Sequence, residues 1–226
     1  MHKKRRKTEI YIFLESNFKI DTMNFELENK LINLLTENKL SEAIELGESE
    51  LKKIPETDFH KIIGRNLLHM KSDLRKFIAQ FDKSTSKILK KKQGLFKSLF
   101  SQLKPAAYYC EMNGFTINYD KWFIELFSFE NYDTTDWDWL SDFYDSSTQF
   151  LTITGFEEIQ KAFEEVHENN RFKEKNIDEA YEVCELLVIL RLQELFRETY
   201  KENDSEEFKI PMFVTAHDYE MIYRVI

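Results

Sequence analysis

Glycine and proline are scarce in this chain, and their scarcity limits the folds open to it. Five glycines and three prolines occur among 226 residues, so few positions can form tight turns or end an element abruptly. Twenty phenylalanines, within a hydrophobic content of 42%, supply bulky material for a core. The composition favours long elements, mostly helices. The length allows one large domain, or a helical part packed on a second module.

The start of the chain carries no targeting signal that we can identify. No run approaches the roughly 18–20 uncharged apolar residues of a membrane span. Glu9 and Glu15 interrupt the basic N-terminus before any signal-like apolar stretch, so we expect a cytoplasmic protein. Because Met23 opens an amphipathic helical pattern, we interpret residues 1–22 as a disordered tail or an upstream translation artefact. Their KKRRK run is typical of a solvated tail, and we do not expect direct nucleic-acid binding.

Helical spacing dominates the first half of the sequence. Apolar residues at helical intervals predict a helical hairpin over residues 25–54, with Ser41 as the cap of its second helix. Pro55 ends this pair, and Thr57 can cap a long third helix whose apolar positions run to Phe81. The hairpin is similar to one tetratricopeptide-type pair. Because no second copy follows, we do not expect a solenoid.

Lysine is concentrated after this third helix. Residues 83–104 hold seven lysines and no acid, and Gly94 allows a break among them. A nucleic-acid or phosphate site needs aromatic or glycine-rich elements between the lysines, and the chain as a whole has a net charge of −9. We therefore interpret the segment as a solvated helix face and a connector.

The pattern changes to strands after Pro105. Alternating residues from Tyr108 to Met112, an Asn-Gly turn signal and the aromatic stretch 121–130 predict a β-hairpin. Residues 149–154 predict a third short strand. The extended segment after Pro211 is expected to complete the sheet.

Two further helices are predicted between these strands. Thr154 with Glu157, and Asn176 with Glu179, have the spacing of capping boxes. The second helix runs to about Tyr200 and is apolar almost all round, so we expect it to be the central buried helix.

These patterns together predict a helix-rich α+β fold. An N-terminal helical hairpin and a long helix are followed by a small antiparallel sheet packed against C-terminal helices. Residues 23–104 form the helical part and residues 105–226 the α+β part, and we expect the two to pack as one compact unit. Cys110 and Cys184 lack metal-ligand spacing and are interpreted as buried core thiols.

Motifs for catalysis or cofactor binding are sparse. The sequence contains no nucleophile elbow, phosphate-binding glycine loop or dinucleotide fingerprint, and no histidine pair at zinc-ligand spacing. His217-Asp218 invites comparison with metal-dependent HD phosphohydrolases, which need a further upstream histidine and a distant aspartate on helices. A side-chain hydrogen bond that shapes a turn is the simpler interpretation. We expect no cofactor and no metal, with a metal-dependent hydrolase using His217 and Asp218 as the alternative.

The acidic segment, residues 129–150, is the most unusual stretch. It reads FENYDTTDWDWLSDFYDSSTQF and combines six carboxylates and seven aromatic rings with no basic residue. It lies within residues 122–160, which hold nine acids and no base. Such a block creates a negative field that steers a basic partner, and tryptophan and tyrosine are frequent interface anchors. Asp136 and Asp138 form a D-x-D pair, but the glycine and terminal glutamate of an EF-hand loop are missing.

Packing offers an alternative explanation for the aromatic residues. Trp137, Trp139 and Phe143 can pack beneath the sheet while the aspartates only face water. A second alternative depends on charge. If the basic residues 83–104 and the acidic residues 122–160 meet within one molecule, the acidic surface is neutralised internally.

A likeness to a known family covers about residues 106–226. Its features are the hairpin YYCEMNGFTINYDKWFIELFSFENYD, the acidic DWDWLSDF, the helix-opening TGFEEIQKAF and the close IPMFVTAHDYEMIYRV. In these features the chain resembles immunity proteins of bacterial polymorphic toxin systems. Residues 23–104 lie outside the likeness, and their lysine cluster departs from a uniformly acidic inhibitor.

The resemblance implies a noncatalytic protein that binds a cognate toxin, often a basic nuclease, and blocks its active site. The acidic segment would then place carboxylates where the toxin expects phosphates, with an aromatic ring in a central pocket. The expected partner contacts are Asp133, Asp136, Trp137, Asp138, Asp142, Tyr144 and Asp145. A helical adaptor protein that uses residues 23–104 stays open as a further alternative.

Overall fold

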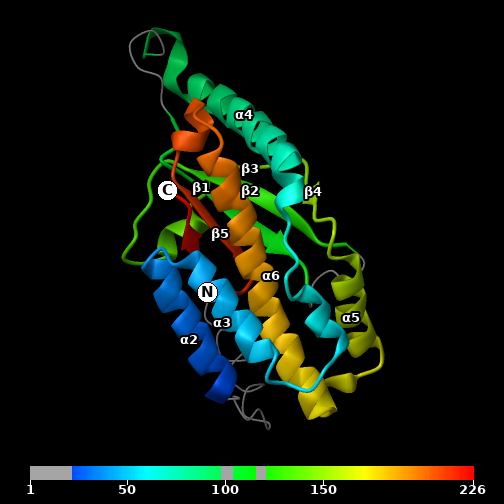
Figure 1. Cartoon of the computed structure of the whole chain (residues 1–226). Helices are drawn as coiled ribbons and strands as arrows, with labels where there is room; N and C mark the ends of the chain where they lie inside the picture. The colour runs from blue at the N-terminus through cyan, green and yellow to red at the C-terminus, as the bar shows by residue number, and fades with distance from the viewer. Residues whose placement is uncertain (1–21, 98–103, 116–120) are drawn as a thin grey trace, which may run out of the picture.

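The computed structural model describes residues 22–97, 104–115 and 121–226, and the fold is helix-rich α+β, as the sequence predicts (Figure 1). Within these residues, five α-helices accompany a small six-stranded sheet. The expected N-terminal tail lies outside the described residues, except for Thr22. Nowhere in the described ranges is a helix both long enough and apolar enough to cross a membrane.

Helices α2 (Thr22–Thr36) and α3 (Leu40–Leu51) form the helical hairpin that the apolar spacing predicts. Asn38 turns the chain between them with a left-handed φ of +58°, a conformation that asparagine tolerates. The expectation that Ser41 caps α3 is wrong. The helix begins one residue earlier, and the Ser41 hydroxyl accepts a hydrogen bond from the Arg197 guanidinium at 3.2 Å.

The long third helix predicted from Thr57 does not form as one piece. Two short 3-10 turns, η2 (Asp58–Ile62) and η3 (Leu68–Met70), come before helix α4 (Lys71–Lys97). Thr57 does cap the first of these turns. Its backbone N–H donates to Nδ1 of His60 at 3.1 Å, and its hydroxyl lies at the same distance from that nitrogen.

Gly64 marks the interruption between the two turns. Its φ of +74° is left-handed, which ends a helix, and its N–H donates to the Glu48 carboxylate at 2.8 Å. The break expected at Gly94 is wrong, because α4 continues through this residue to Lys97. Most apolar positions after Thr57 are nevertheless buried, since the short turns pack on the same central helix as α3 and α4 do.

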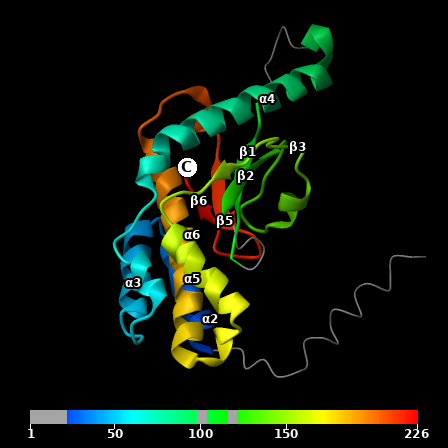
Figure 2. The same ribbon diagram turned by 90° about the vertical axis from the view of Figure 1, so that its right-hand side faces the viewer.

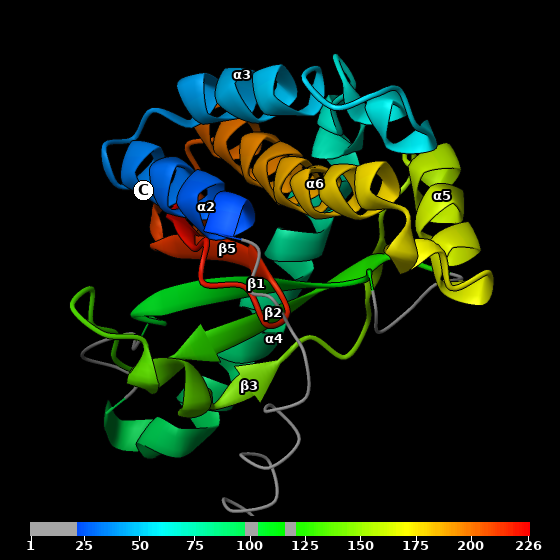
Figure 3. The ribbon, with the colours of Figure 1, turned by 90° about the horizontal axis from the view of Figure 1, so that it is seen from below.

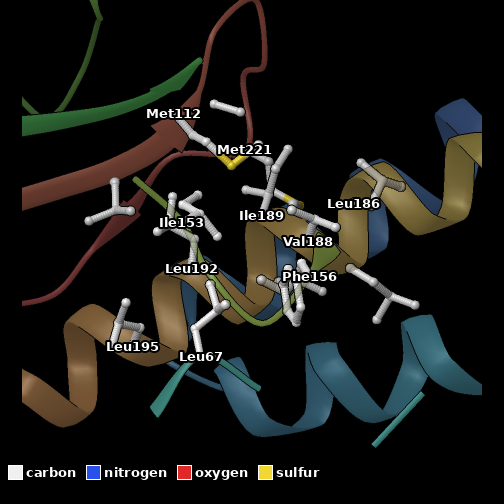
Figure 4. Close-up of a cluster of buried hydrophobic side chains, with 14 of the residues drawn as sticks. Leu67, Met112, Ile153, Phe156, Leu186, Val188, Ile189, Leu192, Leu195 and Met221 are labelled. Atoms are coloured by element: carbon white, nitrogen blue, oxygen red, sulfur yellow. The ribbon is translucent and has the colours of Figure 1, made fainter. Parts of the chain in front are cut away.

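Helix α6 (Lys175–Lys201) is that central helix, as the sequence predicts. Figure 3 shows α2, α3 and α6 on one side of the sheet. The core continues from the helices to the strands and includes Ile189 and Leu192 of α6 beside Met112 and Met221 (Figure 4). Both cysteines are buried free thiols, as expected.

The two predicted capping boxes are wrong. Helix α5 (Glu157–Glu168) begins after Phe156 and α6 begins after Glu174, and neither has a side-chain cap. Thr154 instead places its hydroxyl 3.1 Å from the Nε2 atom of His69. The first pattern failed because a tertiary partner, His69, competes with the helix end for the Thr154 side chain.

The sheet has the strand order β3-β2-β1-β5-β6, and β4 also pairs with β2. Its strands are β1 (Ala107–Asn113), β2 (Phe123–Phe129), β3 (Asp145–Ser146), β4 (Leu151–Thr152), β5 (Met212–Ala216) and β6 (Tyr223–Arg224). The expectation of an antiparallel sheet needs correction at one pair, because β5 joins β1 in parallel. Helices α5 and α6 provide the long crossover that a parallel neighbour requires.

The two faces of this sheet have different surroundings. Tyr108, Cys110 and Met112 of β1 are fully buried in the main core. Helix α4 crosses one end of this helix-covered face, where the Tyr108 hydroxyl donates to Asp82 at 2.7 Å (Figure 2). We call the other side the open face. From β1 and β2 it presents Tyr109, Glu111, Asn113, Phe123, Glu125 and Phe127.

Gln193 joins the central helix to the C-terminal strands. Its buried amide N–H groups donate to the backbone carbonyls of Val214 at 3.1 Å and Met221 at 2.7 Å. We expect Gln193→Leu to lower the free energy of unfolding by about 1–2 kcal/mol, because two buried carbonyls lose a donor. Urea unfolding measures this loss of stability. The control is Gln80→Leu, which makes the same change at an exposed residue. Equal stability of the two variants would contradict the proposed role of the amide.

Candidate partner-binding face

The acidic segment lies across the open face of the sheet and leaves large rings exposed. In the described part of the chain, five large hydrophobic side chains are exposed, and three belong to this segment: Trp137 at 39%, Phe143 at 48% and Phe150 at 56%. Each contacts an aromatic ring beneath it. Ring centroids are 5.9 Å apart for Trp137 and Phe213, 5.1 Å for Phe143 and Phe127, and 4.5 Å for Phe150 and Phe123.

Trp139 anchors the segment to the sheet. It is buried in a second, smaller core with Ala107, Tyr109, Phe129 and Phe213, and its ring centroid lies 4.6 Å from that of Phe129. Core packing therefore explains Trp139, whereas Trp137 stays at the surface. Trp139 packs against the sheet, whereas Trp137, two residues earlier, is accessible to a partner.

Four of the seven expected contact residues are exposed aspartates: Asp133, Asp136, Asp138 and Asp142. Asp133 accepts hydrogen bonds from the backbone N–H and the hydroxyl of Thr135, both at 2.8 Å, and these bonds lower the pKa of its carboxyl. Asp136 accepts from the N–H of Asp138 at 3.1 Å. Short local turns thus hold the carboxylates of Asp133 and Asp136 in place at the surface.

No ion pair joins these four aspartates to a base within the described ranges. The basic segment does contact acids elsewhere. For example, Lys104 pairs with Glu206, on the loop before β5, at 2.5 Å. Internal neutralisation by α4 is therefore not observed for the four exposed carboxylates among the residues that the structure describes.

Tyr144 and Asp145 are placed differently from the other five expected contacts. Tyr144 is half-buried, and burial raises its pKa to about 12. Asp145 lies in β3, and its carboxylate accepts a hydrogen bond from the Thr85 hydroxyl of α4 at 2.9 Å. Asp145 thus fastens the segment to α4 on the helix-covered face.

Two glutamates that the sequence did not single out lie on the same face. Glu111 of β1 and Glu125 of β2 are directly opposite each other in the strand register. Asn113 donates to Glu125 at 2.9 Å, and the Tyr109 hydroxyl donates to Glu111 at 3.3 Å. Side chains alternate between the two faces along each strand, so the sequence allowed both glutamates to be placed on one face of the sheet. Their meeting depends on the register, for which the sequence has no local signal.

His217 joins this group from the turn after β5. Its Nδ1 lies 2.8 Å from the Glu111 carboxylate, and this contact raises the pKa of the imidazole. The neighbouring Asp218 has a left-handed φ of +65°, and its carboxylate lies 3.5 Å from His217 Nε2. The hydrogen bond expected for His217 is present, and it connects the turn to β1. Within the described ranges, no group of three or more His, Cys, Asp or Glu side chains is placed to hold a metal ion.

Comparisons with protein-family models, with curated proteins and with solved structures gave no match to this chain.

Proposed function

We propose that this chain is a noncatalytic binding protein that neutralises a basic protein partner, as an immunity protein does for its cognate bacterial toxin. The observation that supports it is one segment that combines exposed rings with aspartates that form no ion pair among the described residues. Trp137, Phe143 and Phe150 are three of the five exposed large hydrophobic side chains in the described part of the chain, and four exposed carboxylates lie between or beside them. Aromatic anchors within a charged surround are typical of protein interfaces.

Each part of this surface has a distinct role in the proposal. The aspartates produce a negative field that speeds encounter with a basic partner, and they occupy positions that a nuclease reserves for phosphates. The rings give affinity, because their burial on contact removes apolar area from water. Asp145 and Trp139 fix the segment to α4 and to the sheet, so that little ordering is needed on binding. In this proposal the protein acts in the bacterial cytoplasm, before a toxin reaches its target.

Affinity capture from a lysate of the source bacterium tests the proposal. We expect wild type to retain a basic protein, identified by mass spectrometry, that Asp136→Lys/Asp138→Lys loses. Reversing two interface charges typically weakens association by about 100-fold. Glu42→Lys/Glu45→Lys makes the same charge change on exposed residues of α3 and should retain the partner. Equal capture by the Asp136/Asp138 variant and wild type would exclude the segment from the interface.

A further inference from the structure

We infer that residues 217–220, in the turn between β5 and β6, form a pH-sensitive latch that is closed while Glu185 and His217 are protonated. Tyr219 holds the inner side of this turn to the central helix, and His217 holds the outer side to β1. Between them, Asp218 has a left-handed φ of +65°, which is less stable than a right-handed conformation for a residue other than glycine. The turn therefore depends on the contacts at its two sides.

The inner contact joins Tyr219 to a buried carboxyl group without a cation. Glu185 is 8% exposed and accepts hydrogen bonds from the hydroxyls of Tyr219 and Tyr181. No base contributes to its surroundings among the described residues. The charged groups nearest to this contact are acids, namely Glu182 beside Glu185 on α6 and Glu28 of α2 beside Tyr219. A buried carboxylate without a cation is unfavourable, so the closed turn favours the protonated form.

The groups around this contact supply no positive charge. His167 of α5 places Nε2 at 2.9 Å from the Tyr181 hydroxyl, and burial lowers the pKa of its imidazole, which is therefore mostly neutral at pH 7. Glu220, on the turn itself, raises the pKa of the Glu28 carboxyl by its charge. Protonation of Glu185 is thus the way in which this side of the latch avoids an uncompensated charge.

Opening of the turn is coupled to the proton on Glu185. In the closed state, burial raises the pKa of this carboxyl from 4.5 to about 8. When the turn opens, water reaches the carboxyl and its pKa returns toward the ordinary value. Between these two values the open state releases a proton that the closed state keeps, so the opening equilibrium increases by up to about 10-fold per pH unit.

The outer contact responds to pH in the same direction. Nδ1 of His217 lies 2.8 Å from the Glu111 carboxylate, and Nε2 lies 3.5 Å from that of Asp218. Glu125 is directly opposite Glu111 in the strand register, so the imidazole faces acids from its own turn, from β1 and from β2. The contact with Glu111 raises the pKa of His217. This ion pair is complete below the ordinary histidine pKa and weakens as the pH rises through the raised value.

The latch connects a buried group of α6 to the open face of the sheet. Because both contacts need a proton, a rise in pH weakens the two sides of the turn together. Opening moves His217 away from Glu111, which lies on the open face of β1. The device is a property of the free chain and does not depend on the identity of a partner.

Hydrogen exchange of the full chain, followed by NMR at pH 5.5, 6.5 and 7.5, tests the inference. Rates are expressed as protection factors, so that the intrinsic pH dependence of exchange cancels. The probes are the backbone N–H groups of His217 and Tyr219, which both donate to backbone carbonyls. We expect their protection to fall at least about 30-fold from the lowest to the highest pH. The N–H of Lys52, at the end of α3, is the internal control and should change less than about 3-fold.

Variants separate the two protonation sites. Glu185→Gln should reduce the fall in protection at the Tyr219 N–H to less than about 10-fold, and Glu185→Gln/His217→Gln to less than about 3-fold. Glu45→Gln, on the exposed surface of α3, should behave as wild type. Constant protection in wild type, or an unchanged fall in Glu185→Gln, overturns the inference. Protection at Tyr219 equal to that of the buried Leu190 on α6 would also overturn it, because exchange would then report global unfolding.

Discussion

Replacing Glu185 with glutamine should raise the free energy of unfolding at pH 8 by about 3–5 kcal/mol and change it little at pH 4.5. Glu185 lies on the central helix α6 and is only 8% exposed. Burial raises the pKa of its carboxyl to about 8, although hydrogen bonds from Tyr219 and Tyr181 oppose the shift. Glutamine keeps the shape of the side chain and one acceptor oxygen, but it does not ionise.

The sign of this pH dependence follows from the two protonation equilibria. Below pH 4.5, Glu185 holds its proton in both the folded and the unfolded chain, so its burial costs no ionisation. As the pH rises from about 4.5 to about 8, the unfolded chain ionises while the folded chain keeps the proton, and stability falls. Above about pH 8 both states are ionised, and the difference stays constant.

Urea unfolding at the two pH values measures the effect, with Glu45→Gln on the exposed surface of α3 as the control. An equal gain for Glu185→Gln at both pH values would show that packing, and not ionisation, explains it. The result bears on the proposed site as well. Tyr219 lies two residues after His217, so its hydrogen bond to Glu185 connects the central helix to the turn that carries His217.

Strong periodicity made part of the fold predictable. The helical hairpin α2–α3, the buried helix α6 and the β1–β2 hairpin each repeat apolar residues over at least one complete face. Burial of such a face against a neighbour stabilises the element more than local propensity does. These are the elements that the sequence located to within a few residues.

Local signals were poor guides where tertiary contacts compete with them. Ser41 and Thr154 are good capping residues by type, yet their hydroxyls contact Arg197 and His69. Gly64 interrupts a pattern that is otherwise helical, because its N–H bonds to Glu48 instead of continuing a helix. The competing partners are distant in sequence, so neither outcome could be read locally.

The candidate site was predictable in composition but not in geometry. The acid and aromatic content of residues 129–150 was evident from the sequence, and four of its aspartates are exposed in the structure. The direction of Asp145 toward α4 depends on the pairing of β3 with β2. The meeting of Glu111 with Glu125 likewise depends on strand register, which is fixed by the whole sheet.

Trp139→Ala should lower the free energy of unfolding by about 3–4 kcal/mol, whereas Trp137→Ala should lower it by less than about 1 kcal/mol. Trp139 is buried among Phe129, Phe213 and Tyr132, so its removal leaves a cavity between the acidic segment and the sheet. Trp137 is 39% exposed and contacts Phe213 from the outer side. Urea unfolding of the two variants measures the difference, and equal losses would contradict the division between anchor and contact.

Affinity capture of the partner is a second measurement that distinguishes the role of Trp137 from that of Trp139. Trp137→Ala should keep its fold and lose captured partner, because the proposed function makes this exposed ring a partner contact. Trp139→Phe is the matched control, since it keeps an aromatic ring against Phe129 and removes an indole N–H that has no hydrogen-bond partner among the described residues. It should retain both stability and partner. If Trp137→Ala still retains the partner, the exposed indole ring contributes little to binding. The main apolar contacts of the interface would then be Phe143 and Phe150.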